Sequence, residues 1–359
     1  MKDHVPRKLV LLFLALAFTL AGASAASAQP GEFVKGVLQP LADGFPKRAI
    51  SIIVVDDPGT RDDLYAKSLQ QALASISPVP VVVSDEPAAF GGTFDKLKEL
   101  RTREGGTGGY YPVVTDVWGA GTDPLTEPIK KELGMDISDL RMVIITESIT
   151  QFLMQRKNPP WGPTFLGMVK YAKENPGKVR YISKEVGSGI DISCSTIQSM
   201  AGILDKVKKI PQGTMQEVAA TVAAGMGDFC QTYATLATPH IQAGRAELIL
   251  STGFIVPPPY DKDPNIVTLE GAGLPRMQFG AVLGMSVPKE VPQAHVDWLA
   301  KLFKAGATTD LHKKREQMNP GLVIYIMGPA EAEQAKNKYY EMADPIVRGL
   351  GLHIDQKKK

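Results

Sequence analysis

Three segments of the chain place a small hydroxyl side chain three residues before an acidic one, in glycine-containing surroundings. These segments are Thr60 to Asp63, Ser188 to Asp191 and Thr214 to Glu217. The spacing is that of a capping box, in which the hydroxyl accepts a backbone N–H of a new helix and the acid accepts another in return. Such helix starts also present unpaired N–H groups and the positive end of the helix dipole, which favour anions. The pattern predicts either places for a carboxylate or helices capped only for stability, and the spacing leaves both open.

Catalytic and metal-binding chemistry have less support. Gly187-Ser188-Gly189 is not the G-x-S-x-G elbow of serine hydrolases. The later histidines show no H-E-x-x-H or other ligand spacing, and they are His240, His295, His312 and His353. We therefore expect no enzyme, no metal and no cofactor, and a periplasmic hydrolase is the disfavoured alternative.

Alternating strands and helices must position these helix starts. Short β-branched runs bounded by Gly, Pro and Asp predict strands, and periodic segments between them predict helices. The alternation indicates an α/β architecture with largely parallel sheets, whose ligands bind beyond the carboxyl ends of the strands. The predicted strands are 48–55, 79–83, 113–117, 141–146, 179–183, 228–233 and 247–251, and the predicted helices start near 60, 93, 164, 188 and 214.

The N-terminus has the profile of a signal peptide. Three basic residues within Met1 to Lys8 precede the uncharged apolar run Leu9 to Ala21, and Ala26-Ser27-Ala28 forms an A-x-A cleavage pattern. The run is shorter than the roughly 20 residues that cross a bilayer, which disfavours a transmembrane anchor. Residues 1–28 are thus predicted to direct export.

Composition and cysteine content limit the remaining possibilities. A formal net charge of +2 over 359 residues gives no basic stripe for nucleic acid, so no nucleic-acid partner is expected. Cys194 and Cys230 are the two cysteines, and export places them where disulfides persist. A Cys194–Cys230 bridge and two separate buried thiols both remain open.

Several segments, in their order and spacing, resemble one family. They are Lys47 to Asp63, Val81 to Gly92, Tyr171 to Gly202, Pro239 to Gly244 and Thr268 to Pro275. Together they resemble the Bug-type substrate-binding receptors of tripartite tricarboxylate transporters.

The resemblance implies a type II periplasmic-binding-protein fold, with two α/β lobes and a ligand cleft between them. Lobe one would comprise 29–146 plus 277–359, and lobe two 147–276. The implied function is that of a monomeric periplasmic receptor that captures a small organic acid and delivers it to membrane transporter subunits. A receptor that signals to a membrane sensor kinase is the alternative.

The resemblance also carries over a set of binding positions. Those implied for lobe one are Pro58, Gly59, Thr60, Asp63, Gly91, Gly92, Asp116 and Trp118, and those for lobe two are Ser183, Gly187, Ser188, Gly189, Thr232 and Tyr233.

The chain departs from the family pattern at several positions near these loops. Asp56 and Asp57 replace apolar residues, Asp116 and Trp118 replace small ones, and Lys184-Glu185 replaces small polar ones. Added carboxylates repel a second anionic group, so a ligand with one carboxylate and an amine, hydroxyl or aromatic ring is expected, with Trp118 offering a stacking face. Asp56 and Asp57 could equally face solvent or pair with Arg61.

Overall fold

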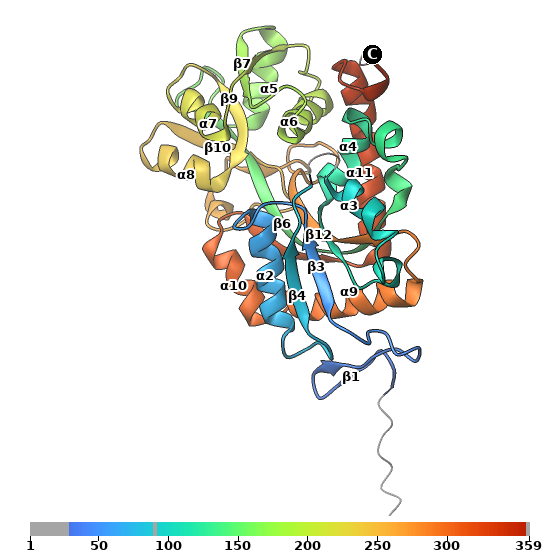
Figure 1. Cartoon of the computed structure of the whole chain (residues 1–359). Helices are drawn as coiled ribbons and strands as arrows, with labels where there is room; N and C mark the ends of the chain where they lie inside the picture. Colours follow the sequence, from blue (N-terminus) through green and yellow to red (C-terminus); the bar gives the residue numbers. More distant parts are fainter. Residues whose placement is uncertain (1–28, 89–91, 357–359) are drawn as a thin grey trace, which may run out of the picture.

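The computed structural model describes residues 29–88 and 92–356 (Figure 1). The predicted signal peptide, residues 1–28, and the predicted site residue Gly91 lie outside the described residues. Among the helices of the described part, none is long and apolar enough to cross a membrane.

Lobe one is built on a six-stranded sheet in the order β4-β3-β5-β12-β6-β13. β3 pairs in parallel with β4 and β5, whereas β12 and β13 run antiparallel to their neighbours. The strands are β3 (Ile50–Val54), β4 (Val81–Asp85), β5 (Val113–Asp116), β6 (Leu140–Arg156), β12 (Gly280–Pro288) and β13 (Leu322–Met327).

Helices cover both faces of this sheet because its strands are apolar on both sides. Along β3, Ile52 and Val54 join one buried cluster and Ile53 joins another. The first cluster lies under α2 and α9, and the second lies under α3, α4 and α11. The helices of lobe one are α2 (Arg61–Leu73), α3 (Gly92–Leu100), α4 (Val117–Thr126), α9 (Gln293–Ala307), α10 (Asp310–Met318) and α11 (Pro329–Gly349).

Lobe two is built on a second sheet in the order β8-β7-β9-β6-β10-β11. Its helices again lie on both faces (Figure 1). The strands are β7 (Val179–Ser183), β8 (Val207–Pro211), β9 (Phe229–Tyr233), β10 (Ala246–Ser251) and β11 (Val267–Thr268), and the helices are α5 (Phe165–Glu174), α6 (Gly189–Met200), α7 (Met215–Ala223) and α8 (Ala234–Gln242).

Short elements complete the described chain. They are the β1–β2 hairpin (Phe33–Val34 and Val37–Leu38), the 3-10 turns η1 (Gly106–Gly108), η3 (Ile137–Asp139), η4 (Tyr260–Lys262) and η5 (Ile354–Gln356), and the π-helical turn η2 (Ile129–Leu133).

The 17-residue strand β6 belongs to both sheets. Residues 140–150 of β6 pair with β12, whereas residues 151–156 pair with β9 and β10. The predicted boundary between residues 146 and 147 falls inside this strand, and the domain limits stay a prediction.

The two cysteines are separate buried thiols, so the alternative of a Cys194–Cys230 bridge is not the arrangement found. Successive side chains of a strand point to opposite faces, so Phe229 and Cys230 of β9 face apart. Cys194 on α6 packs in the cluster that contains Phe229, whereas Cys230 packs in the cluster under α7 and α8. The sheet of lobe two thus separates the two sulfur atoms.

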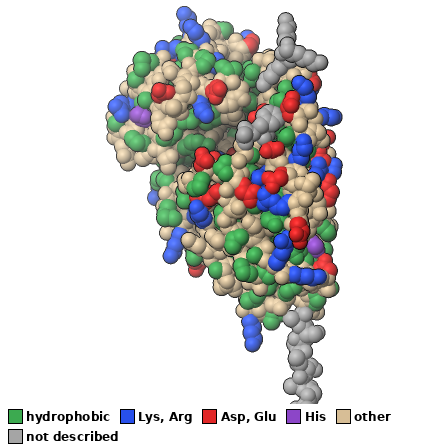
Figure 2. All heavy atoms as spheres, viewed as in Figure 1, with side chains coloured by type: hydrophobic (Ala, Val, Ile, Leu, Met, Phe, Trp, Pro, Cys, Tyr) green, Lys and Arg blue, Asp and Glu red, His purple; other side chains and the backbone are tan. Residues whose placement is uncertain are grey.

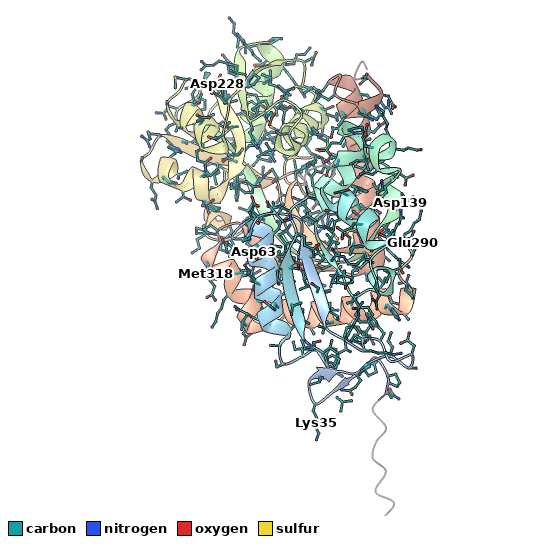
Figure 3. The ribbon with its side chains drawn as sticks, in the orientation of Figure 1. Lys35, Asp63, Asp139, Asp228, Glu290 and Met318 are labelled. Carbon is teal, nitrogen blue, oxygen red and sulfur yellow. The ribbon has the colours of Figure 1, made fainter. Side chains whose placement is uncertain are left out.

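The ion pairs of Asp139 make the stability of lobe one depend on pH in acid. Arg101 and Lys289 each approach its Oδ1 to 2.6 Å, and Arg101 also contacts Glu290 on the same flank (Figure 3). Burial opposes ionisation, but the hydrogen bonds from Lys289 and Arg101 outweigh it and lower the pKa of Asp139 from 3.8 to about 2. A depressed carboxyl pKa stabilises the folded state above the unfolded value, and this contribution is lost as pH falls through the folded value.

We therefore expect the free energy of unfolding to fall as the pH drops from 3.8 to 2, and part of this fall to come from protonation of Asp139. Urea titrations of the wild type and of Asp139→Asn at pH 6, 4, 3 and 2.5 measure it. The variant should be less stable at pH 6 and should lose less stability on acidification. An equally steep pH dependence in both proteins would contradict the assignment.

Candidate ligand-binding cleft

A cavity of about 220 Å³ opens where the two lobes meet. The molecule is hollowed between its upper and lower parts in the space-filling view (Figure 2). The residues that line the cavity come from both lobes. Those of lobe one are Asp116, Trp118, Gly280 and Ala281, and those of lobe two are Gln151 of β6, Lys184, Ser188, Gly189, Ile190, Ser193, Met215 and Tyr233.

The start of α6 forms the lobe-two wall of the cavity. The Ser188 hydroxyl accepts a hydrogen bond from Asp191 N at 3.4 Å and donates one to Glu185 O at 2.8 Å. The buried Asp191 carboxylate accepts from Gly187 N at 3.0 Å and from Ser183 Oγ at 2.8 Å. These bonds hold the glycine loop in place, so the first N–H groups of α6 are presented by a fixed backbone.

The start of α2 has a related construction but a different position. Gly59 N donates to Asp63 Oδ2 at 2.7 Å, as Gly187 does to Asp191. The predicted capping box at Thr60 is wrong, because the Thr60 hydroxyl makes no cap bond and has no partner among the described residues. The α2 loop lies outside the residues that line the cavity.

The capping box predicted at the start of α7 is complete. Glu217 N donates to Thr214 Oγ1 at 3.3 Å, and Thr214 N donates to Glu217 Oε2 at 2.7 Å. The box fixes the start of α7, and Met215, its first residue, reaches the cavity wall.

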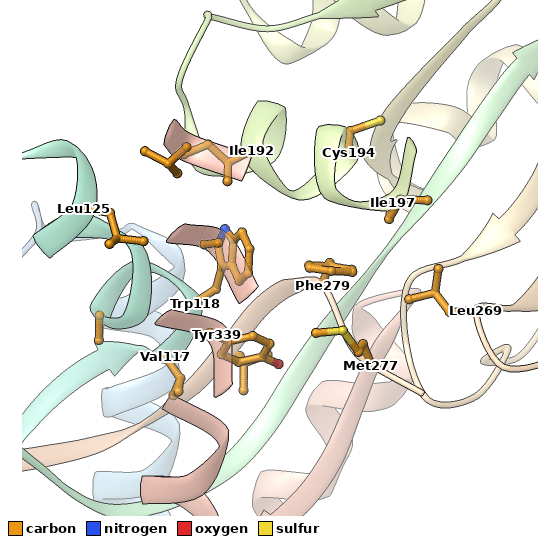
Figure 4. Close-up of a cluster of buried hydrophobic side chains, with 14 of the residues drawn as sticks. Val117, Trp118, Leu125, Ile192, Cys194, Ile197, Leu269, Met277, Phe279 and Tyr339 are labelled. Atoms are coloured by element: carbon orange, nitrogen blue, oxygen red, sulfur yellow. The ribbon is translucent and has the colours of Figure 1, made fainter. Parts of the chain in front are cut away.

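Trp118 connects the two lobes across the cavity. Its indole Nε1 donates to Gly189 O at 3.0 Å, which joins the start of α4 to the start of α6. The ring packs edge-on against the rings of Phe279 and Tyr339, with centroid-to-centroid distances of 5.2 Å and 5.3 Å (Figure 4). With 5% of its surface exposed, Trp118 forms a wall of the cavity, and its role as a stacking face for the ligand stays a prediction.

Gln151 of β6 reaches the cavity at the end of a buried chain of polar side chains. Ser193 Oγ donates to Gln231 Oε1 at 3.0 Å, and Gln231 Nε2 donates to Gln151 Oε1. This arrangement occupies the oxygen of the Gln151 amide and leaves its N–H groups available. The sequence analysis missed Gln151 and Ser193, although polar residues within an apolar strand and helix were a usable signal.

Charged side chains lie on both walls. Arg61 Nη2 is 3.3 Å from Asp116 Oδ2, and Arg61 Nε is 2.7 Å from Asp62 Oδ1. Asp116 Oδ1 also accepts from Trp118 N at 3.2 Å, and burial raises the pKa of the Asp116 carboxyl. On the opposite wall, Lys184 has no carboxylate partner among the described residues.

The structure brings together five of the predicted site residues and leaves the others elsewhere. The five are Asp116, Trp118, Ser188, Gly189 and Tyr233. The residues that do not line the cavity are Pro58, Gly59, Thr60, Asp63, Gly92, Ser183, Gly187 and Thr232. Asp56 and Asp57 are exposed, and Arg61 pairs with Asp62 and Asp116 instead of with them.

Ser183 and Thr232 are fully buried within lobe two, which explains why they do not reach the cavity. Gly187 lies against Leu352, since a β-carbon at that position would be 3.2 Å from the Leu352 side chain. Within residues 29–88 and 92–356, no group of three or more His, Cys, Asp or Glu side chains could hold a metal ion.

Two α/β lobes that share a strand and meet around a cavity define a two-lobed solute-binding protein of the periplasmic type. The chain belongs to the tripartite tricarboxylate transporter receptor family, whose sequence model matches residues 65–348. It is therefore a substrate-binding receptor and not an enzyme, as the sequence indicated.

Relatives of known sequence or structure agree with this placement. A UPF0065 protein from Cupriavidus necator is 23% identical over 334 residues, covering 92% of this chain and 96% of the relative. A TctC solute-binding protein from Polaromonas, solved without ligand, superposes with a TM-score of 0.72 at 16% identity, over 85% of this chain and 99% of that one. An R. palustris protein solved with adipate gives a TM-score of 0.60 at 17% identity, over 86% and 98%.

Proposed function

We propose that this receptor is exported to the periplasm, holds a small organic acid in the cavity between its lobes and delivers it to the membrane subunits of a tripartite transporter. The supporting observation is a set of hydrogen-bond donors that line the cavity. Lys184, the Gln151 amide and the start of α6 at Gly189 and Ile190 line the same cavity. Ser188 also lines it, but its N–H and its hydroxyl both donate to Glu185 O. Such groups favour a carboxylate, since helix N-termini and cations both stabilise negative charge.

The size of the cavity supports a small ligand. At about 220 Å³ it lies below the roughly 300–1,000 Å³ typical of pockets for drug-sized molecules. The adipate in the R. palustris relative is a small carboxylate, which supports the same ligand class.

Delivery to a transporter requires that the lobes separate and close again. Trp118 Nε1 and Gly189 O make a direct hydrogen bond between the lobes beside the cavity, so opening must break it. Ligand groups bound to both walls would favour the closed arrangement, because a ligand shifts a conformational equilibrium by its differential affinity for the two states.

Native mass spectrometry of the protein purified from the periplasm of the cells that naturally produce it tests this proposal. We expect one unaltered small organic acid per chain, released on denaturation. A chain that carries no ligand and binds no organic acid in subsequent titrations would overturn the proposed function.

Gly189→Val is expected to weaken binding of the co-purified acid at least about tenfold. A β-carbon at Gly189 would be 3.3 Å from Trp118 Nε1. A valine side chain would therefore press on the hydrogen-bonded contact between Trp118 and Gly189 and would narrow the cavity. The overall fold should persist, because Gly189 is exposed at a helix start. Isothermal titration calorimetry measures the affinity.

Gln216→Val is the matched control for this variant. Gln216 lies in the first turn of α7, is exposed and is not among the cavity-lining residues. The Gln216→Val variant should bind the co-purified acid with the affinity of the wild type. Equal affinity of Gly189→Val and the wild type would remove the α6 start from the binding site.

A further inference from the structure

The two walls of the cavity differ in charge and in hydrogen-bonding character. The lobe-one wall presents the carboxylate of Asp116. The opposite wall presents Lys184 and the start of α6, and the Gln151 amide N–H groups lie between them. In the space-filling view, acidic side chains gather along the lower rim of the hollow (Figure 2).

Asp116 is only partly neutralised by its neighbours. Arg61 is shared between two carboxylates, and its contact with Asp62 at 2.7 Å is shorter than its 3.3 Å contact with Asp116. One guanidinium facing two carboxylates leaves a formal excess of one negative charge. Burial raises the pKa of Asp116, so the neighbouring groups do not fully compensate for its charged form.

A second ligand carboxylate beside Asp116 would add to this excess charge. A hydroxyl could donate a hydrogen bond to the Asp116 carboxylate but would bring no positive charge, and a quaternary ammonium has no N–H to donate. A protonated amine both donates to Asp116 and brings a positive charge, so the hydrogen bond is strengthened by the attraction between opposite charges.

At the other end of the cavity, a carboxylate suits the available groups. Lys184 is a half-buried cation with no carboxylate partner in the described chain. The Gln151 side chain is 4% exposed, and its oxygen is occupied by Gln231, so the group it offers to a ligand is a donor.

We propose that the ligand is a bipolar molecule of the amino-acid type, with its protonated amine on Asp116 and its carboxylate toward Lys184, Gln151 and the start of α6. This inference rests on the proposed function and narrows its ligand class. It assigns Asp116 as the residue that selects amines over the corresponding hydroxy acids and unsubstituted acids.

The test offers the ligand-free, full-length mature protein an equimolar mixture of the twenty common amino acids, their 2-hydroxy acid counterparts and their unsubstituted counterparts. Native mass spectrometry then identifies the bound member. We expect an amino acid, bound at least about tenfold more tightly in calorimetry than its counterparts, since the hydroxy acid lacks the positive charge and the unsubstituted acid lacks the hydrogen bond as well.

Asp116→Asn and Asp62→Asn form a matched pair of variants. Each removes one carboxylate from Arg61, but only Asp116 lines the cavity. Asp116→Asn should lose most of the preference for the amine while keeping its affinity for the unsubstituted acid, and Asp62→Asn should keep the preference.

The outcomes separate the two proposals. Capture of a hydroxy or unsubstituted acid would overturn the amine assignment and leave the receptor function intact. Binding of no member would count against both. If Asp116→Asn does not fold, the wild-type ratio of affinities still decides, because a ratio near one contradicts the proposal.

Discussion

Glu147→Ala should lower the free energy of unfolding by about 3–5 kcal/mol, since it removes one partner of a buried ion pair. Glu147 on β6 is fully buried and accepts two hydrogen bonds from Arg315 of α10, at 3.0 and 2.8 Å. His312 Nε2 lies 3.5 Å from the same carboxylate. Without Glu147, the Arg315 guanidinium would remain buried beside β6 with no counter-ion, and α10 would lose its main polar attachment to the sheet.

Urea unfolding followed by circular dichroism measures this loss. Glu174→Ala is the control, because Glu174 pairs with Lys170 on the exposed surface of α5 at 4.0 Å and should contribute no more than about 0.5 kcal/mol. The double variant Glu147→Leu, Arg315→Met should recover much of the loss by replacing the ion pair with apolar packing. A loss below about 1 kcal/mol for Glu147→Ala would show that Arg315 finds another partner.

Gly280→Ala should cost about 3 kcal/mol and should also weaken ligand binding. Gly280 begins β12, lines the cavity and has a φ of +134°, which side chains rarely adopt. A β-carbon there would be 2.5 Å from Ile149 O, so the added methyl group would meet the backbone of β6 itself. Because β6 belongs to the sheets of both lobes, it cannot shift away from the methyl group without disturbing the cavity wall.

Gly349→Ala is the matched control, since it lies at the end of α11 and a β-carbon there would meet nothing within 4 Å. Alanine is favoured over glycine in helices, so this variant should be as stable as the wild type or slightly more stable. Thermal unfolding of the two variants together with calorimetry of the proposed ligand separates stability from binding. Unchanged stability of Gly280→Ala would show that β6 and β12 adapt to the methyl group.

Most of the strands and helices before residue 252 were predictable because their apolar periodicity and boundary residues are local. Val179–Ser183 was predicted with the bounds that β7 has. The strand predicted at 141–146 was too short, because the second half of β6 carries buried polar residues such as Glu147, Gln151 and Gln155. Their partners, Arg315, Gln231 and Glu247, are distant in sequence, so no local pattern reveals that these polar residues lie within a strand.

Part of the cavity lining was predictable because its sequence signals are also local. The start of α6, Asp116 at the end of β5 and Trp118 in the first turn of α4 all lie at strand ends, so the general position of a ligand in α/β sheets predicts them. The Thr60 loop has the same local signals, but tertiary packing places it outside the cavity lining. Gly280 and Gln151 reach the cavity from β12 and β6, whose positions depend on pairing between segments far apart in the sequence, and local patterns do not reveal such pairing.

Strand β6 also determines how the gene for this protein could be divided. A fragment cut between residues 146 and 147 would leave lobe two with residues 147–156 as its share of β6, and would leave β12 and β13 of lobe one without partners beyond residue 146. Exposed strand edges of this kind promote aggregation. Circular permutants or fluorescent-protein insertions for a biosensor should therefore open surface loops and keep all seventeen residues of β6 contiguous.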